Sequence, residues 1–157
     1  MTAPLLEVTG LAKHYLLAGG RMLRAVDGVD LTLHPGEALG LVGESGCGKS
    51  TVARLVTRLI PPTAGTISFA GRDIAALPDS ALRPLRRDMQ LIFQNPHAAL
   101  NPRRTVFDSV VEPLVVQGEV AGAERRARVA ALLHEVGLPA IFLHRFPHEL
   151  SGGQKQR

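Results

Sequence analysis

The sequence lacks several features that would each define a class of protein. Cys47 is the only cysteine among 157 residues, which excludes a disulfide framework and a cysteine-based zinc cluster. Aromatic residues make up 4% of the chain and none is tryptophan, so the stacking platforms typical of nucleic-acid-binding proteins are scarce. The longest stretches without charge, 59–71 and 89–102, are short and interrupted by proline, which excludes a transmembrane helix.

A secretory signal is also missing, because Glu7 comes before any basic region and apolar run could form. We therefore expect a cytoplasmic protein. The overall composition is ordinary, with 45% hydrophobic and 20% charged residues, close to the averages for soluble globular domains.

The positive charge is concentrated in the second half of the chain. Residues 1–80 carry 7 Lys and Arg against 7 Asp and Glu, whereas residues 81–157 carry 11 against 7, which accounts for the whole net charge of +4. Because aromatic residues are scarce, this pattern favours an arginine-rich surface that meets a protein partner over a nucleic-acid interface.

Apolar patterns predict an α/β first part and a mostly helical second part, with the change near residue 95. Alternating apolar and polar residues predict strands at 4–9 and 28–33. Shorter apolar runs predict strands at 66–70 and 89–93, and the run 38–42 has the pattern of a strand buried on both faces.

Helices are predicted where apolar residues recur at three- and four-residue spacing. One runs over 52–60 and is stopped by the Pro61-Pro62 pair. Two more are predicted at 105–116 and 124–136, the latter followed by Gly137 and Pro139, which are typical of a helix end.

Residues 43–50 match the phosphate-binding pattern GxxxxGK[ST] in full, between a predicted strand and a predicted helix. Glycines bring backbone N–H groups close to phosphate oxygens, and the helix dipole adds to the attraction of an anion. Lys49 is placed to neutralise the β- and γ-phosphates, and the Ser50 hydroxyl to bind Mg²⁺. The pattern predicts phosphate and Mg²⁺ binding but is shared by kinases, GTPases and ATPases, so it does not by itself select ATP. The candidate contact residues in this loop are Gly43, Glu44, Ser45, Gly46, Cys47, Gly48, Lys49, Ser50 and Thr51.

Cys47 is open to two interpretations: a small residue that fills the loop, or a reactive thiol beside bound phosphate. The second interpretation predicts that an alkylating reagent blocks nucleotide binding and that bound nucleotide protects the thiol.

A second motif, Leu-Ser-Gly-Gly-Gln, begins at Leu150, 101 positions after Lys49. A serine before two glycines at the start of a helix is typical of an N-cap and of an anion-binding terminus. With both motifs in place, the whole chain resembles the ATP-binding cassette (ABC) family, whose signature has this sequence.

The resemblance implies an α/β P-loop NTPase fold, with an N-terminal antiparallel β part and P-loop core over 1–94 and a Q-loop and helical subdomain over 95–157. It implies a dimer in which the signature contacts the γ-phosphate of ATP held by the other subunit. The signature residues that would make this contact are Ser151, Gly152, Gly153 and Gln154.

The same resemblance assigns roles to two further residues. Gln94 matches the Q-loop glutamine, which approaches Mg²⁺ and the attacking water, so Gln94 and Lys49 are the candidate catalytic residues. Tyr15 stands where the family has an aromatic residue that stacks on adenine, although a strand residue packed on the core is the other interpretation.

Two segments, 93–96 (Phe-Gln-Asn-Pro) and 100–103 (Leu-Asn-Pro-Arg), resemble the importers of oligopeptides, dipeptides and nickel, as does Phe-Pro-His-Glu at 146–149. Asn95 and Ala99 depart from the usual Asp and Ser of that group. The resemblance implies coupling of ATP binding and hydrolysis to solute uptake. The implied partners are a second ATPase subunit, permease subunits and, indirectly, a periplasmic or extracellular solute-binding protein. No nucleic-acid partner is expected. The implied location is the cytoplasm, at the inner face of the cell membrane.

The sequence reaches Arg157 within the signature helix, so we expect an N-terminal fragment of the domain. The family's Walker B aspartate, catalytic glutamate, D-loop and switch histidine are not among these residues. Because phosphoryl transfer to water needs a group that positions or activates the water, we expect no ATPase activity from the 157 residues alone. Two alternatives stay open: an ABC ATPase without a permease, and a non-catalytic chain that binds nucleotide or interferes with a dimer.

Overall fold

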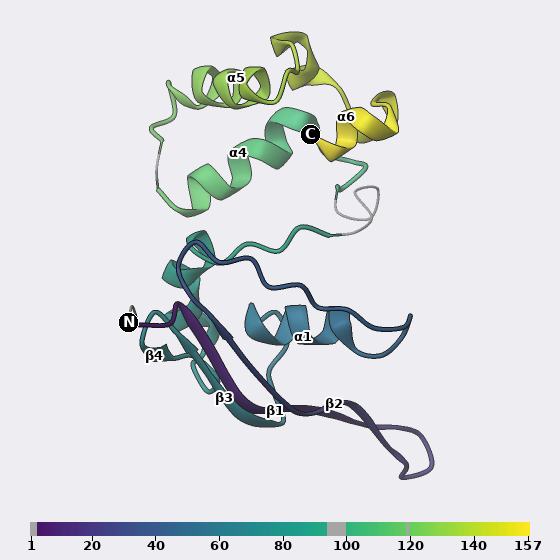
Figure 1. Ribbon diagram of the computed structural model, residues 1–157. Helices are drawn as coiled ribbons and strands as arrows, with labels where there is room; N and C mark the ends of the chain where they lie inside the picture. The colour runs from purple at the N-terminus through teal and green to yellow at the C-terminus, as the bar shows by residue number, and fades with distance from the viewer. Residues whose placement is uncertain (1–2, 94–99, 119) are drawn as a thin grey trace. The chain divides into compact units, whose positions relative to one another are not determined.

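The computed structural model describes residues 3–93, 100–118 and 120–157. The chain forms two compact units, Met1–Leu91 and Ile92–Arg157 (Figure 1). Each unit has its own apolar core. Gln94 lies outside the described residues, as does the predicted domain boundary at 94/95, which stays a prediction.

The first unit contains an antiparallel sheet with the strand order β2-β1-β3-β4. Two glycines in left-handed conformation, Gly19 at φ 80° and Gly20 at φ 75°, make the turn between the first two strands. The predicted strands at 4–9, 28–33 and 66–70 fall in this sheet. Its strands are β1 (Leu6–Leu16), β2 (Met22–Leu33), β3 (Ala64–Phe69) and β4 (Arg72–Asp73).

Helix α1 (Lys49–Val56) packs on this sheet through Val52 and Leu55, the latter fully buried. The predicted helix over 52–60 is therefore confirmed in its first part, but it ends four residues earlier than expected. Two short helical segments, α2 (Asp79–Leu82) and η1 (Arg83–Arg87), close the unit.

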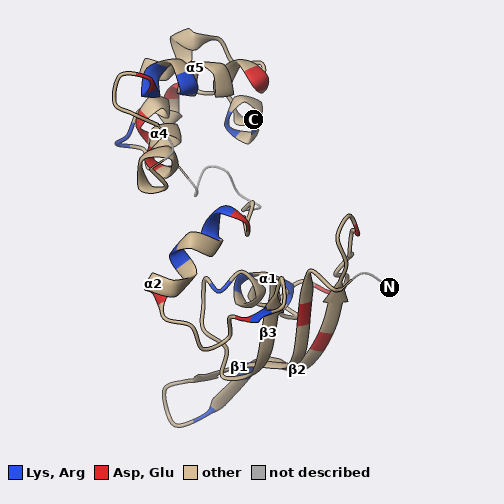
Figure 2. Ribbon diagram, turned by 90° about the vertical axis from the view of Figure 1, so that its left-hand side faces the viewer, with Lys and Arg blue, Asp and Glu red and all other residues tan. Residues whose placement is uncertain are grey.

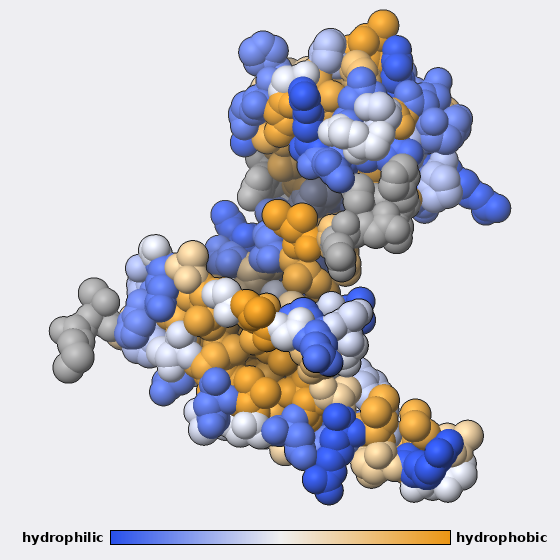
Figure 3. Space-filling model, turned by 45° about the vertical axis from the view of Figure 1, so that its right-hand side comes forward, coloured by the Kyte–Doolittle hydropathy of each residue, from blue (hydrophilic) through white to orange (hydrophobic). Residues whose placement is uncertain are grey.

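Two predicted strands, 38–42 and 89–93, are wrong for this structure, which has no strand at either place. The side chains of 38–42 are exposed instead, and 93% of Val42 is accessible. The run 89–93 is mixed, because 94% of Ile92 is accessible whereas Met89 packs, partly buried, against the core of the first unit. A strand buried on both faces requires paired neighbours and covering helices. The described residues form only the four-stranded antiparallel sheet, so the apolar runs have no strand to pair with. Figure 3 shows apolar side chains gathered on the surface of the first unit.

The second unit is helical, as predicted. Helix α4 begins after Thr105, whose hydroxyl accepts a hydrogen bond from the Asp108 backbone N–H at 3.1 Å in a capping box. Helix α5 confirms the helix predicted at 124–136. The helical elements of this unit are α4 (Val106–Val116), α5 (Arg125–Glu135), η2 (Ala140–His144), η3 (Pro147–Glu149) and α6 (Gly152–Gln156).

Arginines are spread over both units, with blue segments on α5 and after α2 (Figure 2). Within the described residues, no helix has the length and apolarity needed to cross a membrane.

Candidate nucleotide-binding site

The phosphate-binding loop joins the extended segment after β2 to the N-terminus of α1. Gly48 is the N-cap of α1 and has φ 100°, a left-handed conformation that favours glycine. A Cβ atom at Gly48 would lie 2.5 Å from the carbonyl oxygen of Ala25 in β2. Gly48 therefore allows both the turn into the helix and the close approach of the loop to the sheet.

The ammonium of Lys49 lies within its own loop. Its Nζ donates hydrogen bonds to the carbonyl oxygens of Gly43 at 2.7 Å and Glu44 at 2.6 Å. The third acceptor is the Cys47 sulfur at 3.6 Å, which is a weak one. The loop thus holds a positive charge at the start of α1, and only the sulfur bond must be given up for Lys49 to donate to a phosphate oxygen.

The first turn of α1 offers the Ser50 hydroxyl beside Lys49, whereas two of its backbone N–H groups are already satisfied. The Thr51 and Val52 backbone N–H groups already donate to Gly48, each at 2.9 Å. Ser50, next to Lys49, is exposed, so its hydroxyl is accessible. The described residues contain no group of three or more His, Cys, Asp or Glu that could hold a metal ion. The exposed Ser50 hydroxyl fits an Mg²⁺ ion that takes most of its other ligands from nucleotide phosphates and water, as this ion commonly does.

Tyr15 lies near the end of β1, outside the apolar core, with 38% of its surface exposed. The Lys13 ammonium lies 5.2 Å from the centre of its ring, within cation–π range. The ring is therefore accessible to a ligand, and its contact with adenine stays a prediction.

The signature motif lies in the second unit and begins the short helix α6. The Ser151 hydroxyl accepts from the Gln154 N–H at 3.3 Å, and the Gln154 side-chain oxygen accepts from the Ser151 N–H at 2.9 Å. This capping box confirms the predicted helix start at Ser151. Gly152 and Gly153 are exposed in the same turn.

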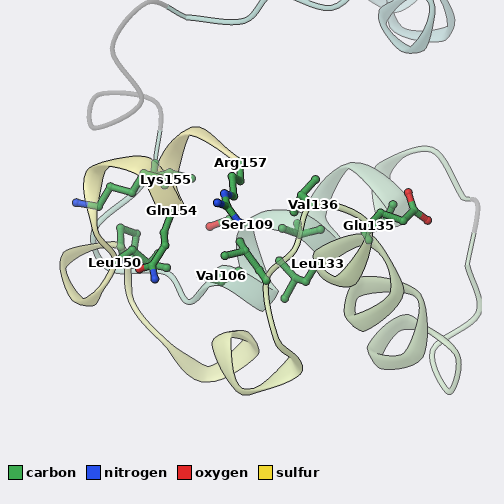
Figure 4. Close-up of a pocket in the computed structure, with 14 residues that line it drawn as sticks. Val106, Ser109, Leu133, Glu135, Val136, Leu150, Gln154, Lys155 and Arg157 are labelled. Carbon is green, nitrogen blue, oxygen red and sulfur yellow. The ribbon is translucent and has the colours of Figure 1, made fainter.

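A cavity of about 270 Å³ lies among α4, α5 and α6 in the second unit (Figure 4). Apolar side chains such as Val106, Leu133 and Leu150 line it, and Gln154 reaches it from the signature helix. The cavity contains no residue of the phosphate-binding loop, so it is not part of the predicted nucleotide site.

Sequence reasoning missed two arginines that fix the far end of α1. The side chains of Arg58 and Arg86 donate to backbone carbonyl oxygens. Because every residue has a carbonyl group, the sequence does not show which residues are their partners.

The family model described as "ABC transporter" matches residues 26–157. A putative peptide import ATP-binding protein of Brucella abortus is 55% identical over 141 residues, which cover 88% of this chain and 42% of the relative. The di/tripeptide transport ATP-binding protein DppF of Pseudomonas aeruginosa is 42% identical, over 97% of this chain and 49% of the relative. The glutathione import ATP-binding protein GsiA of Escherichia coli is 48% identical, over 98% of this chain and 26% of the relative.

Among solved structures, a dimeric ATP-binding cassette in a post-hydrolysis state bound to ADP and Pi is similar, with a TM-score of 0.83 and 32% identity. The match covers 96% of this chain and 65% of that one. The chain belongs to the ABC transporter family, and its fold is that of the ABC-type P-loop NTPases. Both predictions are confirmed. The chain spans less than half the length of the three curated relatives named above.

Proposed function

We propose that this chain is the ATP-binding part of an importer subunit that couples ATP binding and hydrolysis to the uptake of oligopeptides, dipeptides or a related solute. The observation that carries the proposal is the Lys49 ammonium, held at the start of α1 by the carbonyl oxygens of Gly43 and Glu44. The names of the relatives support peptides or peptide-like solutes.

In this proposal the loop binds the phosphates and Lys49 neutralises their charge, while the Ser50 hydroxyl and Gln94 hold Mg²⁺. Bound Mg²⁺ would balance phosphate charge during phosphoryl transfer. The ring of Tyr15 stacks on adenine. Residues 151–154 would contact ATP held by a second ATPase subunit, and transmembrane permease subunits would receive the resulting motion at the inner face of the membrane. A solute-binding protein would deliver the solute to them.

The nucleotide site can be tested by equilibrium dialysis of the chain with ATP and Mg²⁺. We expect Lys49→Ala to weaken ATP binding at least tenfold, since a hydrogen bond to a charged group contributes about 1.5–3 kcal/mol. Arg72→Gln is the matched control, because it removes an exposed positive charge on β4, outside the loop. Equal weakening by both variants would contradict a specific role for Lys49.

The transport role needs a separate test in the producing cell. We expect an affinity-tagged chain, expressed from its own gene locus, to copurify with integral membrane proteins, and Lys49→Ala at the locus to reduce uptake of labelled dipeptides. Binding to nucleic acid with a steep salt dependence, and no membrane partner, would favour the alternative of a non-transport ATPase.

A further inference from the structure

The C-terminal end of α1 is held by an arginine that comes almost thirty positions later in the chain. The Arg86 guanidinium donates to the carbonyl oxygen of Thr57 at 2.6 Å and to that of Arg58 at 2.9 Å. The last carbonyl groups of a helix have no partner within it and carry its negative partial charge. A partly buried positive charge therefore lies where it satisfies two of the carbonyls just beyond α1.

Arg58 extends this arrangement into the chain that follows the sheet. Arg58 is 9% exposed, and its side chain donates to the carbonyl oxygens of Ile74 at 2.8 Å and Leu77 at 3.1 Å. Its backbone has φ 52°, which is uncommon for a residue with a side chain and indicates local strain. The surrounding hydrogen bonds hold it there.

Neither Arg58 nor Arg86 forms an ion pair with a carboxylate in the described part of the chain, so both charges are balanced by carbonyl dipoles. Burying such charges is costly unless their hydrogen bonds are well made. We call this set of five hydrogen-bonded residues, Thr57, Arg58, Ile74, Leu77 and Arg86, the arginine clamp.

The clamp connects the nucleotide loop to the segment that leads to Gln94. Helix α1 has eight residues, about 12 Å at 1.5 Å per residue, with Lys49 at its first position and the clamp just beyond its last. Arg86 belongs to η1, eight positions before Gln94. Because α1 is short and Leu55 is fully buried on the sheet, a shift at one end of the helix has to be accommodated at the other.

We propose that Arg86 is a positioning residue for the nucleotide site. It fixes α1, and thereby Lys49 and Ser50, and it transmits the bound state of the loop to η1. This inference rests on the proposed binding of ATP by the loop. Coupling of this kind is reciprocal: if ATP tightens the clamp, the clamp must strengthen ATP binding by the same factor.

The first test uses the unaltered chain. Hydrogen exchange should slow on addition of ATP and Mg²⁺ at residues 43–52, and also at 57–59 and 83–88. Protection confined to 43–52 would overturn the proposal while leaving ATP binding intact. A chain that binds no ATP would instead refute the proposed function, so the two failures can be told apart.

The second test compares three substitutions by dialysis with ATP and by urea unfolding. We expect Arg86→Gln to weaken ATP binding about fivefold, the lower end of typical allosteric coupling. Arg86→Lys keeps the charge but loses the two-pronged geometry, so an intermediate effect is expected. Arg83→Gln is the control, because Arg83 lies exposed on the same short helix.

A purely structural role would lower the urea midpoint of Arg86→Gln without changing ATP affinity under conditions where the variant is folded. That result would overturn the proposal. If Arg86→Gln does not fold, Arg86→Lys and the exchange measurement on the unaltered chain still decide the question.

Discussion

Gly48→Ala is the substitution whose effect follows most directly from the structure. The new Cβ would meet the Ala25 carbonyl oxygen at 2.5 Å, a contact with backbone that no side-chain rotation can relieve. The left-handed φ of 100° adds strain, about 1–2 kcal/mol for a residue other than glycine. Forcing the loop away from β2 adds about 1–3 kcal/mol, as in other overpacked sites. We therefore expect a total loss of about 2–5 kcal/mol in the stability of the first unit.

The matched control for this substitution is Gly46→Ala in the same loop. Gly46 also has a left-handed φ, 83°, but a Cβ there would meet no atom within 4 Å. It should therefore show the strain alone, and the difference between the two variants isolates the contact with Ala25. Urea unfolding measures the loss of stability. Dialysis with ATP measures the loss of affinity that a displaced loop would cause. Equal effects of the two substitutions would refute the reasoning.

Three further predictions follow from local contacts. Gly43→Ala should weaken ATP binding severalfold, because its Cβ would lie 2.7 Å from the Cys47 sulfur, and adding Cys47→Ala should restore much of that affinity, as dialysis would show. The Cys47 thiol contacts Lys49, so bound ATP should slow the alkylation of Cys47 by iodoacetamide; equal rates with and without ATP would contradict this. Hydrogen bonds from the Thr105 side chain and backbone lower the pKa of Asp108. The ionised carboxylate therefore stabilises the fold at pH values above the usual aspartate pKa, and this contribution is lost as the pH falls through the lowered pKa. In urea unfolding, the stability of Asp108→Asn should depend less on pH in the acid range than that of the unaltered chain.

The parts of the fold that the sequence predicts well are those specified by local chemistry. The glycine spacing before Lys49 defines the loop whatever surrounds it, and Thr105 and Ser151 mark helix starts through side-chain oxygens that accept from the backbone. In each case the residue type itself carries the structural information.

The failures have a different physical origin. The runs 38–42 and 89–93 indicate a preference for burial, but pattern alone does not say whether a neighbouring strand is present to bury them. The roles of Arg58 and Arg86 were missed because their partners are carbonyl oxygens, which every residue possesses. The left-handed backbone of Arg58 had no signal either, since glycine or asparagine is the usual mark of that conformation.

The capping box at the signature has a consequence for how mutations there should be interpreted. A hydroxyl accepts and donates at once, so Ser151 can receive the Gln154 N–H and still offer its own O–H to a negatively charged ligand. Alanine at this position would remove the helix cap and the outward donor together, and any lost activity would combine two causes. Aspartate caps helices about as well as serine but has no proton to give and carries a negative charge, so Ser151→Asp keeps the cap while it removes the donor and repels the ligand.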